Sequence, residues 1–182
     1  MSEFSESYHL FSSDQNETVE LIRASGLHGF ALAPENGWVS FVVDEGEFMP
    51  DPRVTEQNRL CLLHFVNAED HGWSFDLFDG PRSVCRYRCD WEDEVRPDIS
   101  GFQPAEILRL LGSEIAGRLA AVTPQFTPQT IDELFEHETA YDFARALALP
   151  HYEWFSYHGV AGCHERGDKD YAGYIEVPGR KA

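Results

Sequence analysis

The chain has 182 residues, and its 32 acidic and 14 basic side chains give a formal net charge of −18 at pH 7. A surface of this sign repels the phosphates of nucleic acids and the anionic face of a membrane, so we expect the protein to bind neither. At 42% hydrophobic and 13% aromatic, the chain is too rich in core-forming residues for a disordered acidic tail. Residues 1–182 are predicted to form a single globular domain.

The sequence begins Met-Ser-Glu-Phe-Ser-Glu, without the basic segment and apolar run that direct export. No stretch reaches the roughly 18 consecutive apolar residues that a membrane-spanning helix needs. We therefore expect a cytoplasmic protein, whose cysteines are reduced thiols rather than a disulfide framework. The cysteines are Cys61, Cys85, Cys89 and Cys163.

The first elements in chain order are a strand and a capped helix. A strand is predicted over residues 8–12. Asp14, with Glu17 three residues later, has the spacing of a capping box that begins a helix. Gly26 is a natural residue to end this helix, because glycine adopts the left-handed conformation of a helix C-terminus without strain.

A first β-hairpin is predicted from strands 28–33 and 38–44 around the turn signal Pro-Glu-Asn-Gly. A four-residue loop would pair Phe30 with Phe41 and place apolar side chains on one shared face. The following segment, 45–58, is rich in acids and proline and is predicted to be a surface connection.

A fourth strand, which is apolar, is predicted over residues 60–66, and a second hairpin follows it. A three-residue loop, Gly-Pro-Arg, pairs Phe75 with Tyr87 and Leu77 with Cys85, and it sets Asp76 opposite Arg86 on the other face. A slip of one residue would break both the apolar and the charged pairs, so the register is specified.

The pattern changes to a helical period after Trp91, where acids and Pro97 end the predicted sheet. A helix opens at Pro104, with a bend at Gly112 or Gly117. A second helix opens at Thr127-Pro128, with the capping-box spacing repeated from Thr130 to Glu133, and extends toward Pro150. Thr139 is an alternative start for a separate helix. The tail, 151–182, is predicted to be irregular and aromatic, with a candidate edge strand at 171–177.

This order of elements, sheet-rich over 1–97 and helix-rich over 98–150, predicts the α+β class. The expected architecture is a mainly antiparallel sheet, built from two β-hairpins, with helices packed on one face. The oligomeric state is left open.

No established metal or nucleophile motif is complete in the sequence. His137-Glu138 begins like a zinc-protease helix, but Tyr141 stands where the second histidine is required. Cys85 and Cys89 would lie about 13 Å apart on a strand, too far to share one ion, so they are predicted to be buried apolar thiols. The chain also lacks a Gly-x-Ser-x-Gly elbow and a phosphate-binding glycine loop.

Two weaker constellations are candidates for chemistry. His158, Cys163 and His164 are metal-ligand types gathered in a short stretch, which leaves a transition metal such as zinc open although no cofactor is expected. Asp70 and His71 are adjacent, as in an acid–base pair, although sequence neighbours seldom point at one another.

The acid excess is concentrated before residue 57, where eleven acids and two bases supply half of the net charge. Acids in predicted loops are the best candidates for binding a basic protein partner. These candidates are Glu45, Glu47, Asp51, Glu69 and Asp70. We expect a bacterial, non-catalytic binding or inhibitory protein of the immunity or antitoxin kind. The alternative is a small enzyme or ligand-binding domain with a pocket between sheet and helices. One version of this alternative depends on a bound metal ion.

Overall fold

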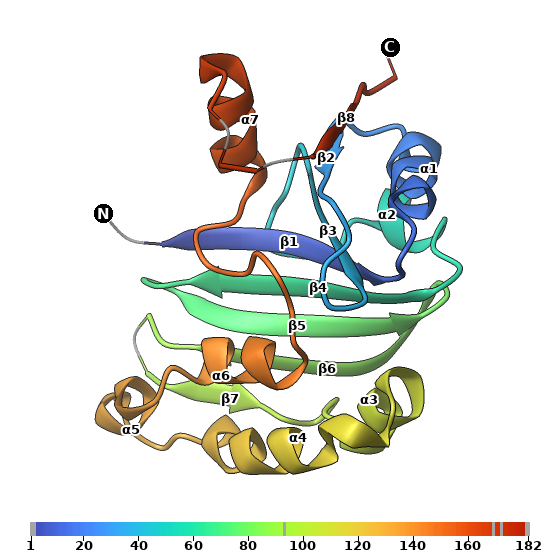
Figure 1. Ribbon diagram of the computed structural model, residues 1–182. Coiled ribbons are helices and arrows are strands. Elements are labelled where there is room, and N and C mark those ends of the chain that lie inside the picture. The colour runs from blue at the N-terminus through green and yellow to red at the C-terminus, as the bar shows by residue number, and fades with distance from the viewer. Residues whose placement is uncertain (1–2, 93, 169, 172, 181–182) are drawn as a thin grey trace.

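Eight strands and seven helices make up the described part of the chain, residues 3–92, 94–168, 170–171 and 173–180 of this computed structural model (Figure 1). The strands are β1 (Phe4–Phe11), β2 (Gly29–Ala31), β3 (Trp38–Val43), β4 (Cys61–Ala68), β5 (Gly72–Asp79), β6 (Arg82–Asp90), β7 (Arg96–Asp98) and β8 (Ile175–Val177). The helices are α1 (Gln15–Ser25), α2 (Pro52–Thr55), α3 (Pro104–Leu111), α4 (Ala116–Val122), α5 (Ile131–Glu136), α6 (Thr139–Ala146) and α7 (Tyr157–Arg166).

The strands form one antiparallel sheet in the order β7-β6-β5-β4-β1-β3-β2-β8, which confirms the α+β class and the mainly antiparallel sheet. The expected construction from two hairpins is not confirmed, because β1 lies at the centre of the sheet. There Tyr8 pairs with Phe41 of β3 on one side and with His64 of β4 on the other. The sheet also continues past its predicted end at Trp91 into the short edge strand β7.

The register of the β5–β6 hairpin is as predicted, with Phe75 opposite Tyr87 and Leu77 opposite Cys85. The β2–β3 hairpin is shifted by one residue, so Phe30 pairs with Val42 rather than with Phe41. Both residues of its Asn-Gly turn adopt positive φ, 53° and 82°, which is the geometry of a tight two-residue turn. The predicted four-residue loop is therefore wrong, and the strands beyond this turn pair in a different register.

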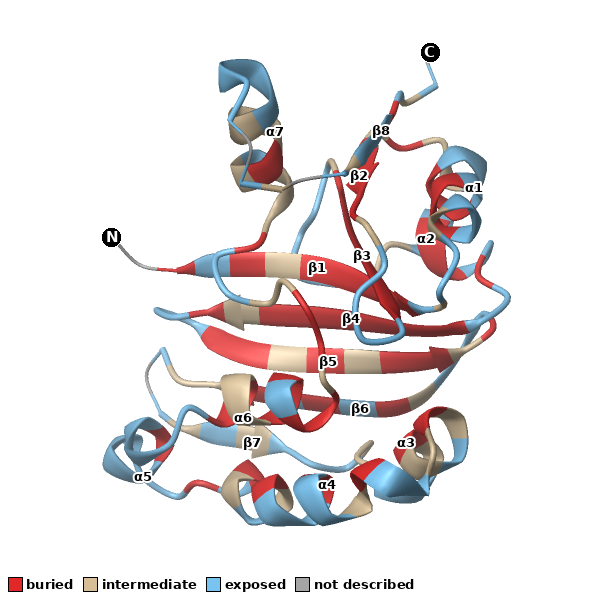
Figure 2. Cartoon of the chain, in the orientation of Figure 1, coloured by how far each residue is buried: buried red, intermediate tan, exposed pale blue. Residues whose placement is uncertain are grey.

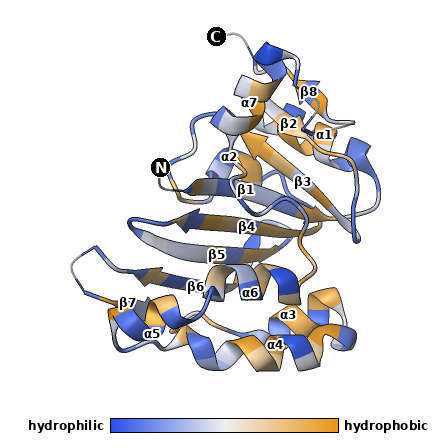
Figure 3. Ribbon diagram, turned by 60° about the vertical axis from the view of Figure 1, so that its left-hand side comes forward, coloured by the Kyte–Doolittle hydropathy of each residue, from blue (hydrophilic) through white to orange (hydrophobic). Residues whose placement is uncertain are grey.

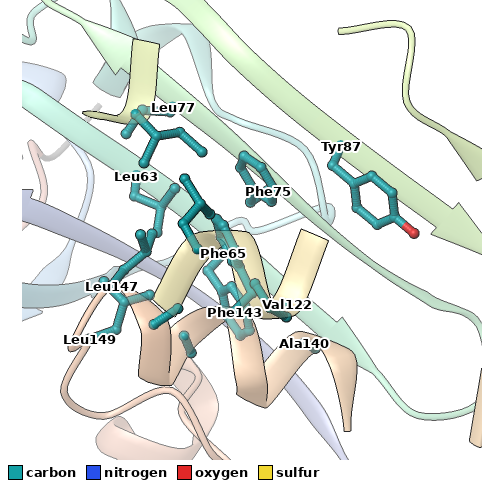
Figure 4. Packing of buried hydrophobic residues seen from close by; sticks show 14 of the residues in the cluster. Leu63, Phe65, Phe75, Leu77, Tyr87, Val122, Ala140, Phe143, Leu147 and Leu149 are labelled. Atoms are coloured by element: carbon teal, nitrogen blue, oxygen red, sulfur yellow. The ribbon is translucent and has the colours of Figure 1, made fainter. Parts of the chain in front are cut away.

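One face of the sheet is covered by α3 to α6 over β4, β5 and β6. Phe143 of α6 stacks on Phe75 of β5 with ring centroids 4.2 Å apart, and Leu147 and Leu149 lie near Leu63 in the same apolar cluster (Figure 4). The strand residues under these helices are buried, whereas the outward sides of α4 and α5 are exposed (Figure 2). This agrees with the prediction that the helix-rich segment packs on one face.

The opposite face is covered by α1 and α2, so the helices do not share a single face. β1 and β2 run in the same direction with β3 between them, which makes α1 a crossover connection that must pass over the sheet. Leu21 and Ile22 of α1 and Val54 of α2 are buried against Phe41 and Val43. Because β3 is covered on both faces, all its residues are buried and its ribbon is mostly hydrophobic (Figure 3).

Capping residues set most of the helix limits. Asp14 accepts a hydrogen bond from the backbone N–H of Asn16, and Gly26 ends α1 at φ 79°. Gly112, at φ 97°, separates α3 from a short 3-10 turn that leads into α4, which confirms one of the two predicted bends. The alternative start at Thr139 is also correct, because α5 and α6 are separate helices.

The tail is not irregular, because it contains α7 and then the edge strand β8. Ser156 caps α7 by accepting a hydrogen bond from the Gly159 N–H at 3.3 Å, and Gly167 ends the helix at φ 71°. Val160 is the one residue of α7 that is fully buried, so the helix lacks the apolar stripe that would have predicted it. Within the described residues, none of the helices has the length and apolar composition needed to cross a lipid bilayer.

Candidate functional site

The acidic loop, residues 44–51, connects β3 to α2 and displays two large apolar side chains. Phe48 and Met49 are 39% and 57% exposed. Glu45 and Phe48 both have positive φ, 62° and 57°, a strained conformation for residues with a side chain. The end of the loop is fixed by the backbone N–H of Asp51, which donates to the Tyr8 hydroxyl at 2.8 Å. The loop is thus held in a shape that presents its apolar tip to solvent.

The side chain of Arg53, in α2 directly after the acidic loop, holds both ends of this loop. The Arg53 guanidinium donates to Glu45 at 2.8 Å and to Asp51 at 2.7 Å. Partial burial would raise the pKa of Asp51, but the hydrogen bonds and charge of Arg53 outweigh it and hold that pKa below its usual value. Two of the predicted partner-binding acids therefore already have an internal cation.

The β4–β5 turn, residues 69–71, lies beside the acidic loop. The ring of Phe4 is 6.1 Å from Phe48 and 5.9 Å from His71, so it links the loop to the turn. The His71 Nδ1 atom lies 2.6 Å from a carboxylate oxygen of Glu92, and no hydrogen bond joins it to Asp70 within the described residues. The predicted Asp70–His71 pair is therefore replaced by a His71–Glu92 pair.

Three hollows surround the acidic loop and the β4–β5 turn. The loop hollow, of about 310 Å³, lies between the loop and the start of α7 and includes Glu45 and Asp51. The turn hollow, of about 320 Å³, lies between the loop and the turn and includes Glu47. The aromatic pocket, of about 380 Å³, lies between the turn and the α5–α6 junction and includes Glu69. With Asp70 in the turn, all five predicted acids lie in or beside the acidic loop and the β4–β5 turn, at the end of the sheet where β1 begins.

The charges at this end are not equally available to a partner. Glu69 accepts a hydrogen bond from the Glu3 N–H at 2.9 Å. Glu47 and Asp70 are exposed, and neither takes part in an ion pair within the described part of the chain. Of the predicted acids, Glu47 and Asp70 therefore have the charges least used by the fold itself.

A buried carboxylate, Glu3, lies under this surface and was not predicted from the sequence. Its side chain accepts hydrogen bonds from the Trp154 N–H at 2.8 Å and from the Asn67 amide at 3.3 Å. The hydroxyls of Ser5 and Tyr141 also donate to it. Burial and the Glu3 carboxylate raise the pKa of Tyr141. Glu3 thus ties the start of β1 to the helical layer and to the segment that precedes α7.

His9 lies further along β1 than Glu3 and Ser5, and its side chain is completely buried. Ser40 donates its hydroxyl proton to the Pro150 carbonyl at 3.1 Å, so it accepts from His9 Nδ1 at 2.9 Å. The other ring nitrogen, Nε2, then accepts from Ser7 at 3.0 Å. In this series of hydrogen bonds, both ring nitrogens of a neutral imidazole have a partner. Burial, with smaller contributions from His151 and His64, lowers the pKa of His9 to about 3. We interpret His9 as a structural residue that positions the segment before α7.

A second buried imidazole, His64, lies on the opposite face of the sheet. Its Nε2 atom is 3.1 Å from a carboxylate oxygen of Glu6, which lines the loop hollow. On its other side, His64 is the cross-strand partner of Asp76, whose pKa is raised by burial despite the nearby His64 and Arg86. Alternation along β4 could have placed His64 on this face, but its partner on β1 could not be read from the sequence.

The predicted metal ligands do not converge, because they lie on a helix at spacings that point in different directions. His164 Nδ1 lies 2.6 Å from the Tyr174 hydroxyl, and its Nε2 lies 3.5 Å from Glu176. His158 lines the loop hollow instead. Among the described residues, Cys163 is grouped only with Asp168 and Asp170, neither of which was a predicted ligand.

The thiols on β6 lie in the core, as their alternation predicted. Cys85 and Cys89 are 1% and 0% exposed, and both belong to the cluster under α3 to α6. Burial raises the pKa of Cys85 to about 11 and also raises that of Cys89.

Comparison of the chain with protein-family models, curated proteins and solved structures gives no match. Function is therefore inferred from the geometry and chemistry of this end of the sheet.

Proposed function

We propose that this is a non-catalytic, cytoplasmic binding protein that docks on a basic protein partner and acts as an inhibitor of the immunity or antitoxin kind. The observation that carries the proposal is that Glu47 and the exposed Phe48 and Met49 line the turn hollow, across from the β4–β5 turn that carries the exposed Asp70. We call these four residues the docking surface.

The chemistry of the docking surface suits recognition of a protein. Large apolar side chains anchor an interface by burying area, and surrounding charges increase the rate of association and select the partner. Phe48 and Met49 supply the apolar anchors, Glu47 adjoins them in the acidic loop, and Asp70 lies in the turn on the other side of the turn hollow. The net charge of −18 extends the attraction to any cationic surface beyond contact distance.

The experiment is an affinity capture from the native host with the full chain, at low and at high salt. Glu47 and Asp70 are changed together to lysine, and the captured basic protein is then purified and titrated against both forms. The double reversal is expected to weaken binding at least about tenfold and to flatten its salt dependence, because attraction at the contact becomes repulsion.

A matched control changes the same net charge at Glu56 and Glu114, which are exposed and lie in α2's C-terminal cap and the turn before α4. Glu56 and Glu114 line neither the loop hollow nor the turn hollow, and salt screens exposed charges that lie outside the contact, so the control is expected to weaken binding less than about threefold. Equal losses from both double reversals, or binding that ignores salt, would contradict the proposal.

The second candidate function, a small enzyme or ligand-binding domain, is favoured by the His71–Glu92 contact in the turn hollow. An imidazole oriented by a carboxylate at 2.6 Å can act as a general base. Its metal-dependent form is tested by metal analysis of the purified protein with and without chelator. Stoichiometric zinc that is lost in Cys163→Ser, together with a lower melting temperature in chelator, would favour this alternative.

A further inference from the structure

The aromatic pocket has a composition that the docking surface does not explain. Its walls are Trp91, Phe135, Tyr141 and Trp154, together with the buried Trp73. Phe135 is 62% exposed and Trp154 is 51% exposed, so their rings are accessible to a ligand. The volume of about 380 Å³ is within the usual range of ligand pockets.

The electrostatics of the pocket are anionic. Glu3, Glu69 and Glu138 line it, and no lysine or arginine is among its described lining residues. Glu138 is paired with Arg145 at 3.1 Å, but Glu3 and Glu69 take part in no ion pair of the described chain. Glu3 is 4% exposed and is held by neutral donors, so a carboxylate without a counter-ion lies beside accessible aromatic rings.

The rings are fixed in place by backbone contacts rather than by packing alone. The Trp91 indole N–H donates to the Glu69 carbonyl at 3.0 Å, and its ring lies 6.0 Å from that of Phe135. Trp154 is in the left-handed region at φ 51°, and its backbone N–H donates a hydrogen bond to the Glu3 carboxylate. The indole of Trp154 is therefore displayed by a segment that Glu3 positions directly.

We infer that the aromatic pocket receives an arginine side chain of the basic partner, an inference that rests on the proposed function. Aromatic faces attract a cation through their quadrupole, and carboxylates beside them complete its charge and hydrogen bonds. Arginine fits better than lysine because its guanidinium is planar, stacks on rings and is less strongly hydrated. The pocket opens beside Glu69, so an arginine within it would belong to a partner seated on the β4–β5 turn.

The test uses N-acetyl-L-argininamide as a probe of an arginine within a chain, with the uncharged N-acetyl-L-citrullinamide as its isostere. Binding is followed by NMR of the four tryptophan indole N–H signals in the full-length protein. The arginine probe is expected to shift the signals of Trp91 and Trp154. Trp38 is expected not to respond, because it is 1% exposed and its indole N–H donates to Leu147. The citrulline probe is expected to shift none of them.

Substitutions on one helix supply matched variants. Phe135→Ala is expected to weaken the arginine probe about fivefold, as the loss of one cation–π contact predicts. Ile131→Ala, on the same helix and 45% exposed but outside the pocket lining, is expected to leave binding unchanged. Glu3→Gln removes the buried charge and is also expected to weaken binding.

Each failure has a distinct meaning. Equal shifts with the citrulline probe, equal shifts of all four tryptophans, or equal effects of Phe135→Ala and Ile131→Ala would overturn the inference. Tighter binding of free L-arginine than of the capped probe would also overturn it, since that result indicates a small-molecule site. If the captured partner binds Phe135→Ala normally but not the Glu47/Asp70 reversal, the pocket inference fails while the proposed function stands. The reverse result would place the partner at the aromatic pocket and remove the role proposed for Glu47 and Asp70.

Discussion

The buried His9 makes stability depend on pH in a way that can be isolated by one substitution. Its pKa is lowered from 6.5 to about 3 by burial and by His151 and His64. In the unfolded chain the imidazole binds a proton below pH 6.5, whereas in the folded protein it stays neutral. Protons therefore favour the unfolded state, and the stability present above pH 6.5 is lost progressively as the pH falls toward 3.

The expected loss between pH 8 and pH 5 is about 2 kcal/mol from His9 alone, because one pKa unit corresponds to about 1.4 kcal/mol. His9→Gln removes the titration but keeps a side chain that can hydrogen-bond to Ser7 and Ser40. At pH 8 this variant is expected to lower the free energy of unfolding by about 1–3 kcal/mol. The reason is that at least one of the three hydrogen bonds that run from Ser7 through His9 and Ser40 to the Pro150 carbonyl is lost. Its further loss on going to pH 5 is expected to be about 2 kcal/mol smaller than that of the wild type.

Urea unfolding followed by tryptophan fluorescence at pH 8 and at pH 5 measures these differences. All other ionisable groups are present in both proteins, so the contributions of groups distant from His9 cancel in the comparison. The exposed His137→Gln is the control and is expected to retain the wild-type pH dependence. If His9→Gln loses as much stability at pH 5 as the wild type, the structural role assigned to a neutral His9 is wrong.

Three further predictions concern two glycines and the accessibility of the thiols. Gly72→Ala places a methyl 2.5 Å from the Cys89 carbonyl and is expected to lower the free energy of unfolding by about 1–3 kcal/mol in urea. Gly117→Ala, in α4 with nothing within 4 Å, is expected to raise it by about 0.5–1 kcal/mol in the same assay. Ellman's reagent at pH 8 is expected to titrate one thiol rapidly, that of the half-buried Cys163, and all four after unfolding.

The helix limits were the most predictable part of the fold, because each depends on a few adjacent residues. The caps at Asp14, Gly26 and Thr130 are where their spacing indicated. The helix α7 has equally local signals in Ser156 and Gly167, but its glycines and its single buried residue hid the helical period. A search for caps alone, without requiring an apolar stripe, could have found it.

Strand pairing was predictable only where charge and hydrophobicity agreed. In the β5–β6 hairpin, Asp76 opposite Arg86 supported the same register as the apolar pairs. In the β2–β3 hairpin both faces are apolar, so a slip of one residue costs nothing in the pattern, and the sequence did not specify the register. The central place of β1 had no signal in the sequence, since its partners come from distant segments.

The functional site divides in the same way. Local composition was enough to place acids in loops, and those loops do lie at the surface around Glu47 and Asp70. The sheet order brought the two loops together, because β3 and β4 end beside the start of β1. The aromatic pocket is a product of tertiary structure alone, since Glu3, Trp91 and Trp154 meet only when the helical layer and the segment before α7 fold onto the sheet.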